Sequence, residues 1–363
     1  MGENIVLGLL VALPCLSGGA LGVLYRHVRR RRGLAPWPLV VLGNVLLLFF
    51  LLSGMALAGE VYFRFFFDAT DGLMFSKVSQ RWFERHYKWN SANLRDDLQY
   101  SLRIAPGKRR ISFVGDSFTV GQGIKNIEDR FANALRREHP EWEIHLLAML
   151  GFNTGDEIDY LLKWLPKGYQ LDEVVLVYCL NDIGDLLPEE EAMVSRLNRD
   201  AQQEGWLRRN SYLINTLYAR LKLRRDPALK AVLDYERAAY LDGPVWELQK
   251  RRLTAFRNLV ESNGGKLAVV TFPFFQALGP NYDYEFAHRK LDAFWQSLKV
   301  PHLDLWPVYA GTPRGKLMVN RYDAHPNEYA HALATPVIEK FLLEHLSAKT
   351  NSVTEPHVST GTH

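Results

Sequence analysis

A short apolar run at residues 111–114 constrains the fold more than any other feature of the sequence. Its β-branched and aromatic side chains predict a buried strand. The run ends in Gly115-Asp116-Ser117, where the chain is expected to turn sharply before a helix at residues 126–139. Ser117 is therefore expected at the carboxyl end of a strand, where open α/β sheets bind their ligands. A serine in that position is a candidate nucleophile.

Patterns typical of strands and helices alternate along residues 108–346. This order predicts a parallel sheet with helices on both faces, which is a three-layer α/β/α architecture. The apolar content of 47% is sufficient for one substantial core. Strands are predicted at residues 111–114, 143–148, 173–179, 267–271 and 302–305, and helices at residues 126–139, 155–165, 245–263, 284–298 and 327–346.

Two stretches near the amino terminus, residues 4–24 and 36–59, are almost free of charged side chains. Each is long enough, as a helix, to cross about 30 Å of hydrocarbon. The loop between them is rich in arginine, and short basic loops stay in the cytoplasm. We therefore predict that residues 1–59 anchor the chain in the cell inner membrane, with everything after Glu60 on the extracytoplasmic, periplasmic side. A cleaved signal peptide is the alternative for the first stretch, but Glu3 and the lack of a basic residue before that stretch disfavour it.

Three segments lie outside the alternating pattern. Residues 60–107 form an aromatic-rich connector, which we expect to be ordered because it contains few Gly and Ser residues. Residues 186–243 form a helical insertion. The basic amphipathic part of this insertion, at residues 206–230, either lies on an anionic membrane surface or forms a cap helix with a solvated charged face, and we favour the cap. Residues 347–363 are predicted to be disordered.

Composition and short motifs exclude several classes of function. The net charge of +4 is mild, and the basic residues do not follow one stripe beside stacking aromatics, so no nucleic-acid partner is predicted. Cys15 lies in an apolar stretch and Cys179 in a predicted core strand, so these two cysteines are not expected to pair. The sequence contains no CxxC, HExxH or GxxxxGK[ST] motif, so no metal or nucleotide cofactor is predicted. The sequence does not indicate an oligomeric state.

The other parts of a hydrolytic site also follow predicted strands or precede a predicted helix. Pro326 suits the first position of a helix, so His325 is expected on the loop just before it, with Asp323 two residues earlier. Gly151 follows the second strand and offers a backbone N–H, and Asn181 follows the third and offers a side-chain amide. Donors aimed at an oxyanion are worth about 10²–10³ in rate each. Taken singly, a turn glycine and a helix-capping Asn remain the alternatives.

Four motifs in this order resemble the SGNH (GDSL-like) hydrolase family. Gly115-Asp116-Ser117 resembles its nucleophile block, and Gly151 resembles its glycine block. Cys179-Leu180-Asn181-Asp182 resembles the Gly-x-Asn-Asp block, and Asp323-Ala324-His325-Pro326-Asn327 resembles the closing Asp/His block. The resemblance covers residues 108–346.

The sequence departs from the family pattern at two places. Cys179 stands where the family has a glycine. Asp323 precedes His325 by two residues, whereas three is the commoner spacing in the family. Asp323 remains the expected acid of the triad, and Asp182 is the alternative.

The resemblance implies a flavodoxin-like fold and a two-step acyl transfer. Ser117 is the expected nucleophile, His325 the base, and Asp323 the acid that orients the imidazole. The expected oxyanion hole consists of the backbone N–H groups of Ser117 and Gly151 and the side-chain amide of Asn181.

The anchor and the family resemblance together predict a membrane-anchored serine esterase that acts outside the cytoplasm. Family members of similar architecture suggest an ester-bearing glycan as substrate, with O-acetyl groups on envelope or exported polysaccharide. An O-acyltransferase with the same triad is an alternative, as are a phospholipase and a thioesterase. A non-catalytic envelope scaffold on a hydrolase fold is the alternative from another class. Asp116 is expected to shape the turn before Ser117, and His331 is expected to be structural.

Overall fold

The computed structural model of this chain describes residues 1–31 and 34–346, so the predicted disordered tail at 347–363 lies outside the described residues. The chain forms two compact units. Unit 1 combines Met1–Tyr87 with Ala192–Lys230, and unit 2 combines Lys88–Glu191 with the chain from Ala231 onward. Helices α7 (Pro188–Gln202) and α10 (Pro227–Ala239) each run from one unit into the other.

Unit 2 contains a five-stranded parallel sheet with the strand order β2-β1-β3-β4-β5. This is the order of flavodoxin-like folds, in which ligands bind at the carboxyl ends of the strands, where the strand order reverses. Apolar runs form these strands because both faces of the sheet are covered. The strands are β1 (Arg109–Gly115), β2 (Trp142–Ala148), β3 (Glu173–Cys179), β4 (Lys266–Phe272) and β5 (His302–Asp304).

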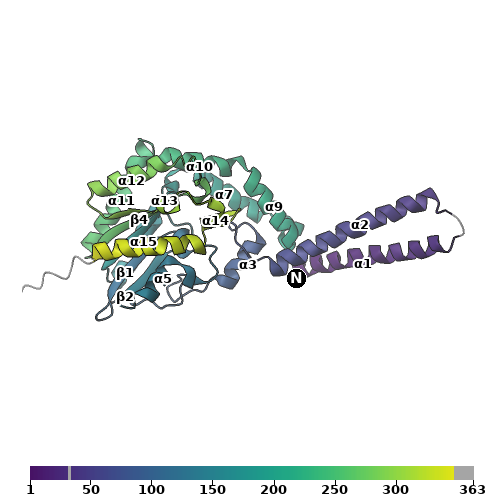
Figure 1. The fold of residues 1–363 in the computed structure, drawn as a ribbon, viewed down its shortest axis with the longest axis horizontal. Helices are drawn as coiled ribbons and strands as arrows, with labels where there is room; N and C mark the ends of the chain where they lie inside the picture. Colours follow the sequence, from purple (N-terminus) through teal and green to yellow (C-terminus); the bar gives the residue numbers. More distant parts are fainter. Residues whose placement is uncertain (32–33, 347–363) are drawn as a thin grey trace, which may run out of the picture. The chain divides into compact units, whose positions relative to one another are not determined.

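Helices cover both faces of this sheet (Figure 1). Helix α5 (Phe131–Glu138) packs against α15 (Glu328–Leu346), and α6 (Thr154–Trp164) packs against α11 (Pro244–Ser262). Helix α12 (Glu285–Ser297) contacts the edge strand β5. Right-handed crossovers place α5 and α15 on one face and the other three helices on the opposite face. The predicted three-layer α/β/α fold with a parallel sheet is thereby confirmed.

The core of unit 2 lies between the sheet and these helices. Every residue of β3 is buried, as expected for the central strand of a covered parallel sheet. Large side chains from different elements meet there with little or no exposed surface, among them Phe113, Phe131, Phe256, Phe272 and Trp295.

Two local predictions differ from the structure. The helix predicted at 126–139 is a 3-10 turn (Ile127–Asp129) followed by α5, because Arg130 between them adopts an extended conformation. Pro326 does not begin a helix. It ends the short strand β7 (Asp323–Pro326), and Asn327 caps α15 by accepting the N–H of Ala330 at 3.0 Å.

Unit 1 is built around two long apolar helices, α1 (Gly2–Arg29) and α2 (Trp37–Val61). A single π-helical turn continues α2 to Phe66. Gly2–Arg29 and Trp37–Phe66 are long and apolar enough to cross a membrane, by length and composition. Their most apolar windows are only 11% and 6% buried, unlike the core helices of globular proteins.

Three shorter helices complete unit 1. They are α3 (Lys77–His86), α8 (Trp206–Asn210) and α9 (Tyr212–Arg225). The side chain of Ser76 caps α3, and that of Ser211 caps α9, as expected for serine at a helix N-terminus. The middle of the predicted insertion, residues 192–230, therefore belongs to the same compact unit as the apolar helices.

Candidate active site

The turn between β1 and the short helix α4 (Ser117–Val120) presents Ser117. Asp116 caps α4, because its carboxylate accepts the N–H of Phe118 at 2.8 Å. The residue before Asp116 has to be glycine, because a Cβ on Gly115 would lie 2.3 Å from Thr119 Oγ1 and 2.8 Å from the carbonyl oxygen of Val177. Ser117 thus lies at the carboxyl end of β1, as the sequence predicts, and it is also the first residue of α4, a short helix that the sequence did not predict.

Ser117, His325 and Asp323 form one hydrogen-bonded chain. The Oγ of Ser117 lies 2.8 Å from Nε2 of His325. The Nδ1 of the same imidazole lies 2.5 Å from Oδ1 of Asp323. The Asp323 side chain is fully buried and that of His325 is 13% exposed. This spacing matches the nucleophile–base–acid arrangement of serine hydrolases.

A small antiparallel hairpin carries the histidine and the acid of this chain. Strand β6 (Met318–Asn320) pairs with β7, with Asp323 opposite Asn320. The Asn327 side chain ties the base of the hairpin to the carbonyl oxygens of Lys316 and Met318, at 2.9 and 3.0 Å. His325 therefore lies on a strand rather than on the loop that we predicted.

The spacing of two residues between Asp323 and His325 suits this strand. The backbone N–H of His325 donates to the same Oδ1 that its Nδ1 contacts, at 3.1 Å. The carboxylate folds back over its own strand and reaches both groups at once. The alternative acid, Asp182, instead accepts the N–H of Cys179 at 2.9 Å.

Cys179 is buried and unpaired, as is consistent with the expectation that the two cysteines do not pair.

Charges around His325 set its protonation. Burial lowers the pKa of the imidazole, but the charge and hydrogen bond of Asp323, with the charge of Asp116, outweigh burial and raise the pKa above its usual value. A general base must be neutral, so activity is expected to fall as the pH drops through this raised pKa.

Replacing Asp323 by asparagine tests this electrostatic coupling. Loss of the negative charge lowers the pKa of His325, so the acid limb of the pH profile of kcat/KM is expected to move to lower pH. The wrong tautomer of the imidazole should also reduce kcat by about 10⁴. The profile of an ester substrate between pH 5 and 9 measures both effects. An unmoved acid limb would show that another group controls it.

The two other predicted oxyanion donors follow the neighbouring strands. Ala148 of β2 and Val177 of β3 both lie opposite Gly115, so Gly151 and Asn181 follow at the same edge of the sheet. Gly151 is exposed with φ +72°, in the left-handed region that favours glycine. Within residues 1–31 and 34–346 the Gly151 N–H has no hydrogen-bond acceptor. This N–H is available to a ligand.

Asn181 points toward the turn that carries the nucleophile. Its Nδ2 donates to Oδ2 of Asp116 at 3.4 Å, and Ser117 Oγ lies at the same distance from that oxygen. An amide nitrogen has two N–H groups, so the second remains for a developing oxyanion. The structure thus brings Asn181, Asp116 and Ser117 together around one carboxylate oxygen.

Asn181→Ala is expected to reduce kcat by about 10²–10³ with little change in KM, because the donor acts on charge that develops in the transition state. Steady-state kinetics with a chromogenic ester measure kcat and KM separately. Asn153→Ala is a matched control, since the side chain of Asn153 caps α6 instead. A change in KM alone would assign Asn181 to substrate binding.

Two carboxyl groups near the nucleophile carry no counter-charge. Glu157 on α6 is buried, and neither of its oxygens has a hydrogen-bond partner within the described part of the chain. Burial raises the pKa of Glu157, and the charges of Asp116 and Asp156 raise it further. The pKa of Asp182 is raised by burial and by Glu157. Burial thus favours the neutral form of both carboxyl groups, and it also raises the pKa of Asp116.

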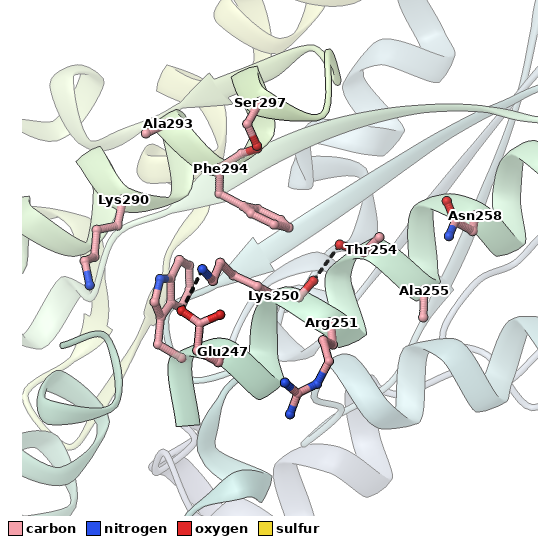
Figure 2. Close-up of a pocket in the computed structure, with 11 residues that line it drawn as sticks. Glu247, Lys250, Arg251, Thr254, Ala255, Asn258, Lys290, Ala293, Phe294 and Ser297 are labelled. Carbon is pink, nitrogen blue, oxygen red and sulfur yellow. Dashed lines mark hydrogen bonds and ion pairs between the residues drawn. The ribbon is translucent and has the colours of Figure 1, made fainter. Parts of the chain in front are cut away.

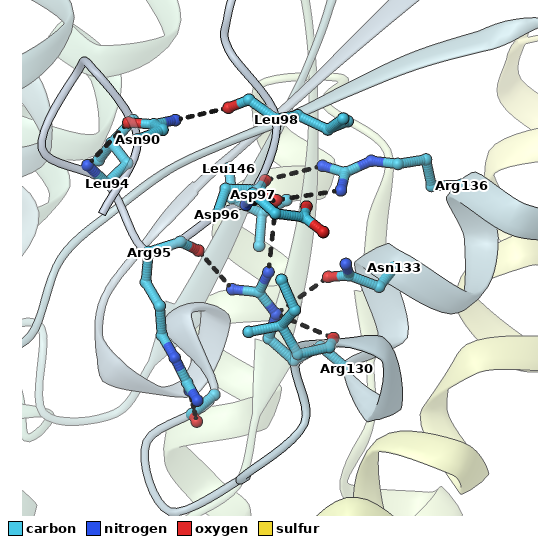
Figure 3. Close-up of polar contacts among 12 residues, drawn as sticks. Asn90, Leu94, Arg95, Asp96, Asp97, Leu98, Arg130, Asn133, Arg136 and Leu146 are labelled. Atoms are coloured by element: carbon cyan, nitrogen blue, oxygen red, sulfur yellow. Dashed lines mark hydrogen bonds and ion pairs between the residues drawn. The ribbon is translucent and has the colours of Figure 1, made fainter. Parts of the chain in front are cut away.

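A network of buried charges supports the loop after α4, and sequence analysis did not reveal it (Figure 3). The Arg95 guanidinium donates to the carbonyl oxygens of Val120, Gly121 and Ile124. The backbone carbonyl of Arg95 accepts from Arg130 at 2.9 Å. The loop that leaves the nucleophile helix is thus held by the segment before β1.

Asp96 connects this network to α5. Its carboxylate accepts from Arg136 at 2.8 and 3.2 Å and lies 3.9 Å from Arg130. Burial opposes its ionisation, but the hydrogen bonds of Arg136 and the charges of both arginines lower the pKa of Asp96 to about 2. Tyr100 also donates to Asp96 at 2.5 Å.

His331 on α15 is buried and lies outside the catalytic chain. Its Nδ1 accepts the N–H of Phe131 at 3.2 Å, and the two rings stack. Burial, aided by the charges of Arg130 and Arg95, lowers the pKa of His331 to about 3, so the ring is neutral. This environment agrees with the structural role expected for it.

A separate groove of about 690 Å³ lies between α11 and α12 (Figure 2). Trp246 and Phe294 form its apolar wall, and Lys290 and the Glu247–Lys250 ion pair line its rim. It includes none of the candidate catalytic residues. Over residues 1–31 and 34–346, no group of three or more His, Cys, Asp or Glu side chains could hold a metal ion.

No family model matches this sequence, and no curated protein matches it. Among similar solved structures is an extracellular lipase from Streptomyces rimosus, with 15% identity and a TM-score of 0.42 over 64% of this chain and 99% of that one. Another is the esterase EstA from Pseudoalteromonas sp., with 14% identity and a TM-score of 0.38 over 66% and 99%. A third is a two-domain esterase active on acetylated mannans, with 14% identity and a TM-score of 0.37 over 70% and 54%.

Others are described as lipolytic proteins of the G-D-S-L family or as an SGNH hydrolase. This is the family that the sequence motifs resemble.

Proposed function

We propose that this chain is a membrane-anchored serine esterase of the SGNH type. The observation that carries the proposal is the hydrogen-bonded chain from Ser117 through His325 to Asp323 at the carboxyl edge of a parallel sheet. In the proposed division, residues 1–59 anchor the enzyme, 60–107 connect, and 108–346 hold the hydrolase fold with its insertion at 186–243. The arginine-rich loop after α1 supports an orientation with the catalytic residues on the periplasmic side of the inner membrane.

The first half-reaction forms an acyl-enzyme. The neutral Nε2 of His325 takes the proton of Ser117 as Oγ attacks the ester carbonyl carbon, and Asp323 holds Nδ1–H in the matching tautomer. The developing oxyanion accepts hydrogen bonds from the N–H groups of Ser117 and Gly151 and from the Asn181 amide. The C–O bond to the alcohol then breaks, and the alcohol leaves with the proton from Nε2.

The second half-reaction releases the acid. A water molecule gives a proton to Nε2 and attacks the acyl carbonyl carbon, and the same donors stabilise the oxyanion. The bond between the acyl carbon and Ser117 Oγ then breaks, Oγ takes the proton back from Nε2, and the carboxylic acid leaves. If a sugar hydroxyl takes the place of water, the same site transfers the acyl group instead.

O-acetyl groups on envelope or exported polysaccharide are the proposed substrates. The anchor supports this choice, because an enzyme held at the membrane meets polymers of the cell envelope at high local concentration.

The experiment incubates the full chain in detergent with an O-acetylated polysaccharide and separately with p-nitrophenyl esters of increasing chain length. Release of free acetate that exceeds acetylation of any added acceptor supports hydrolysis. Acetylated acceptor that outpaces free acetate would establish a transferase with the same site. Preference for long acyl chains would contradict the proposed acetyl ester and indicate a lipase or thioesterase.

A further inference from the structure

Helix α9 presents an apolar stripe to its surroundings. Ile214, Leu217, Tyr218 and Leu221 follow the spacing of one helical face, and each is between 37% and 53% exposed. The preceding helix α8 adds the exposed side chains of Trp206 and Leu207. We call these six residues the α8–α9 stripe. Contiguous exposed apolar side chains of this kind mark a contact surface.

The N-terminus of α9 is fixed to the apolar helix α2. The buried carboxylate of Glu60, at the end of α2, accepts from Ser211 Oγ at 2.7 Å and from the N–H groups of Tyr212 and Leu213 at 3.0 and 2.9 Å. A carboxylate at a helix N-terminus is favoured by the unpaired N–H groups and by the helix dipole. A Cβ on Gly59 would lie 2.9 Å from Leu213, so the two helices are in close contact.

The start of α1 lies at this same end of the helical hairpin (Figure 1). Helix α8 packs against α1, and a Cβ on Gly2 would overlap the side chain of Asn210. Glu3 forms an ion pair with Lys77 at 2.6 Å, and its carbonyl oxygen accepts from Arg64 at 3.0 Å. Charged groups are costly in hydrocarbon, so in the proposed anchor this end of α1 and α2 lies outside the hydrocarbon core.

Basic side chains accompany the stripe. Arg224 and Arg225 are exposed in the last turn of α9, and Arg209 is exposed on α8. Exposed Trp and Tyr side chains are typical of the membrane–water interface, and arginine side chains close to a membrane surface are attracted to anionic lipid headgroups.

We propose that the α8–α9 stripe inserts into the headgroup region of the leaflet that α1 and α2 leave, with Arg209, Arg224 and Arg225 on anionic phospholipids. The inference rests on the proposed anchoring of α1 and α2 in a membrane. The residues predicted above to form a cap helix would then be a third membrane contact, with the apolar side chains about 5–10 Å deep at the boundary of headgroups and acyl chains.

The test uses the full chain with Cys15→Ala, which leaves only the buried Cys179. Single cysteines replace Leu217 in the stripe, Leu48 in α2 or Leu162 on α6, each of which is exposed. Each cysteine carries an environment-sensitive fluorophore, in vesicles of equal parts phosphatidylcholine and phosphatidylglycerol. Quenching by spin-labelled lipid and by aqueous iodide is measured.

The label at 217 is expected to lose most of its fluorescence to spin-labelled lipid and to be protected from iodide, as is the label at 48. The label at 162 should show the reverse. Quenching by lipid at 48 but not at 217 would overturn the stripe contact and leave the anchor intact. Protection of 217 from both quenchers would mean that protein covers the stripe, which also overturns the inference. No lipid quenching at 48 would overturn the anchor itself.

The charge contribution is tested in the same assay. Vesicles of phosphatidylcholine alone, or the double substitution Arg224→Glu and Arg225→Glu, are expected to reduce lipid quenching at 217 and leave it unchanged at 48. Equal quenching at 217 in all three conditions would overturn the anionic part of the contact. The unfolding temperature of each labelled protein, compared with that of the Cys15→Ala background, verifies that the chain remains folded.

Discussion

Replacement of Ser117 by alanine is expected to reduce kcat for p-nitrophenyl acetate by about 10⁴–10⁶. The reason is that Ser117 Oγ, 2.8 Å from His325 Nε2, is the proposed attacking atom, and no acyl-enzyme forms without it. Stopped-flow and steady-state assays of the full chain in detergent measure the loss. The initial burst of p-nitrophenol that marks acyl-enzyme formation should disappear in the variant.

Ser112→Ala is the matched control for this substitution. Ser112 is also a buried serine of the β1 region, but its hydroxyl lies 2.9 Å from the Tyr169 hydroxyl, away from the catalytic chain. The activity of the Ser112→Ala variant should stay near that of the wild type. Equal activity of Ser117→Ala and the wild type would remove Ser117 from the mechanism. A wild type without any ester hydrolysis would favour transfer to an untested acceptor or a scaffold role.

Asp96→Asn is expected to lower the free energy of unfolding by about 3–5 kcal/mol, the usual cost of removing one partner of a buried ion pair. The Asp96 and Arg130 side chains have no exposed surface, so the substitution leaves a buried arginine without its counter-charge. Thermal or denaturant unfolding of the full chain measures the change. Asp97→Asn is the control, because the neighbouring carboxylate is exposed and its loss should cost less than about 0.5 kcal/mol.

The same pair predicts how stability depends on pH. The pKa of Asp96 falls to about 2 in the folded chain, below its value in the unfolded chain. Its contribution to stability is therefore fully present above about pH 4 and is lost as the pH falls toward 2. Asp96→Asn should lack this part of the acid transition. An identical acid transition in both proteins would mean that other carboxylates dominate it.

The sequence predicted the elements that local patterns determine. Each strand of the sheet lies within a few residues of its predicted position, because a covered parallel strand needs a continuous apolar run. Ser117 and Asn181 could be placed at the carboxyl edge for the same reason, since the end of such a run is visible in sequence.

Contacts between distant segments could not be predicted in this way. Strands β6 and β7 have three and four residues, too few for a periodic pattern, so the hairpin that carries His325 was expected to be a loop. The ion pair of Asp96 with Arg130 joins residues far apart in the chain. The residues that flank Asp96 and Arg130 in the sequence form no motif that indicates a buried charge. The attachment of α9 to Glu60 joins still more distant residues and is absent from any local pattern.

Unit 1 also determines an order of events during biosynthesis. The ribosome completes α1 and α2 first, yet their partners α8 and α9 lie beyond Glu191, after the first three strands of the sheet. The hydrogen-bond donors of the Glu60 carboxylate are Ser211, Tyr212 and Leu213. These hydrogen bonds cannot form until the chain between Glu60 and Leu213 has been synthesised. Whatever surrounds this end of the hairpin during that interval has to solvate the Glu60 carboxylate and is then replaced by α9.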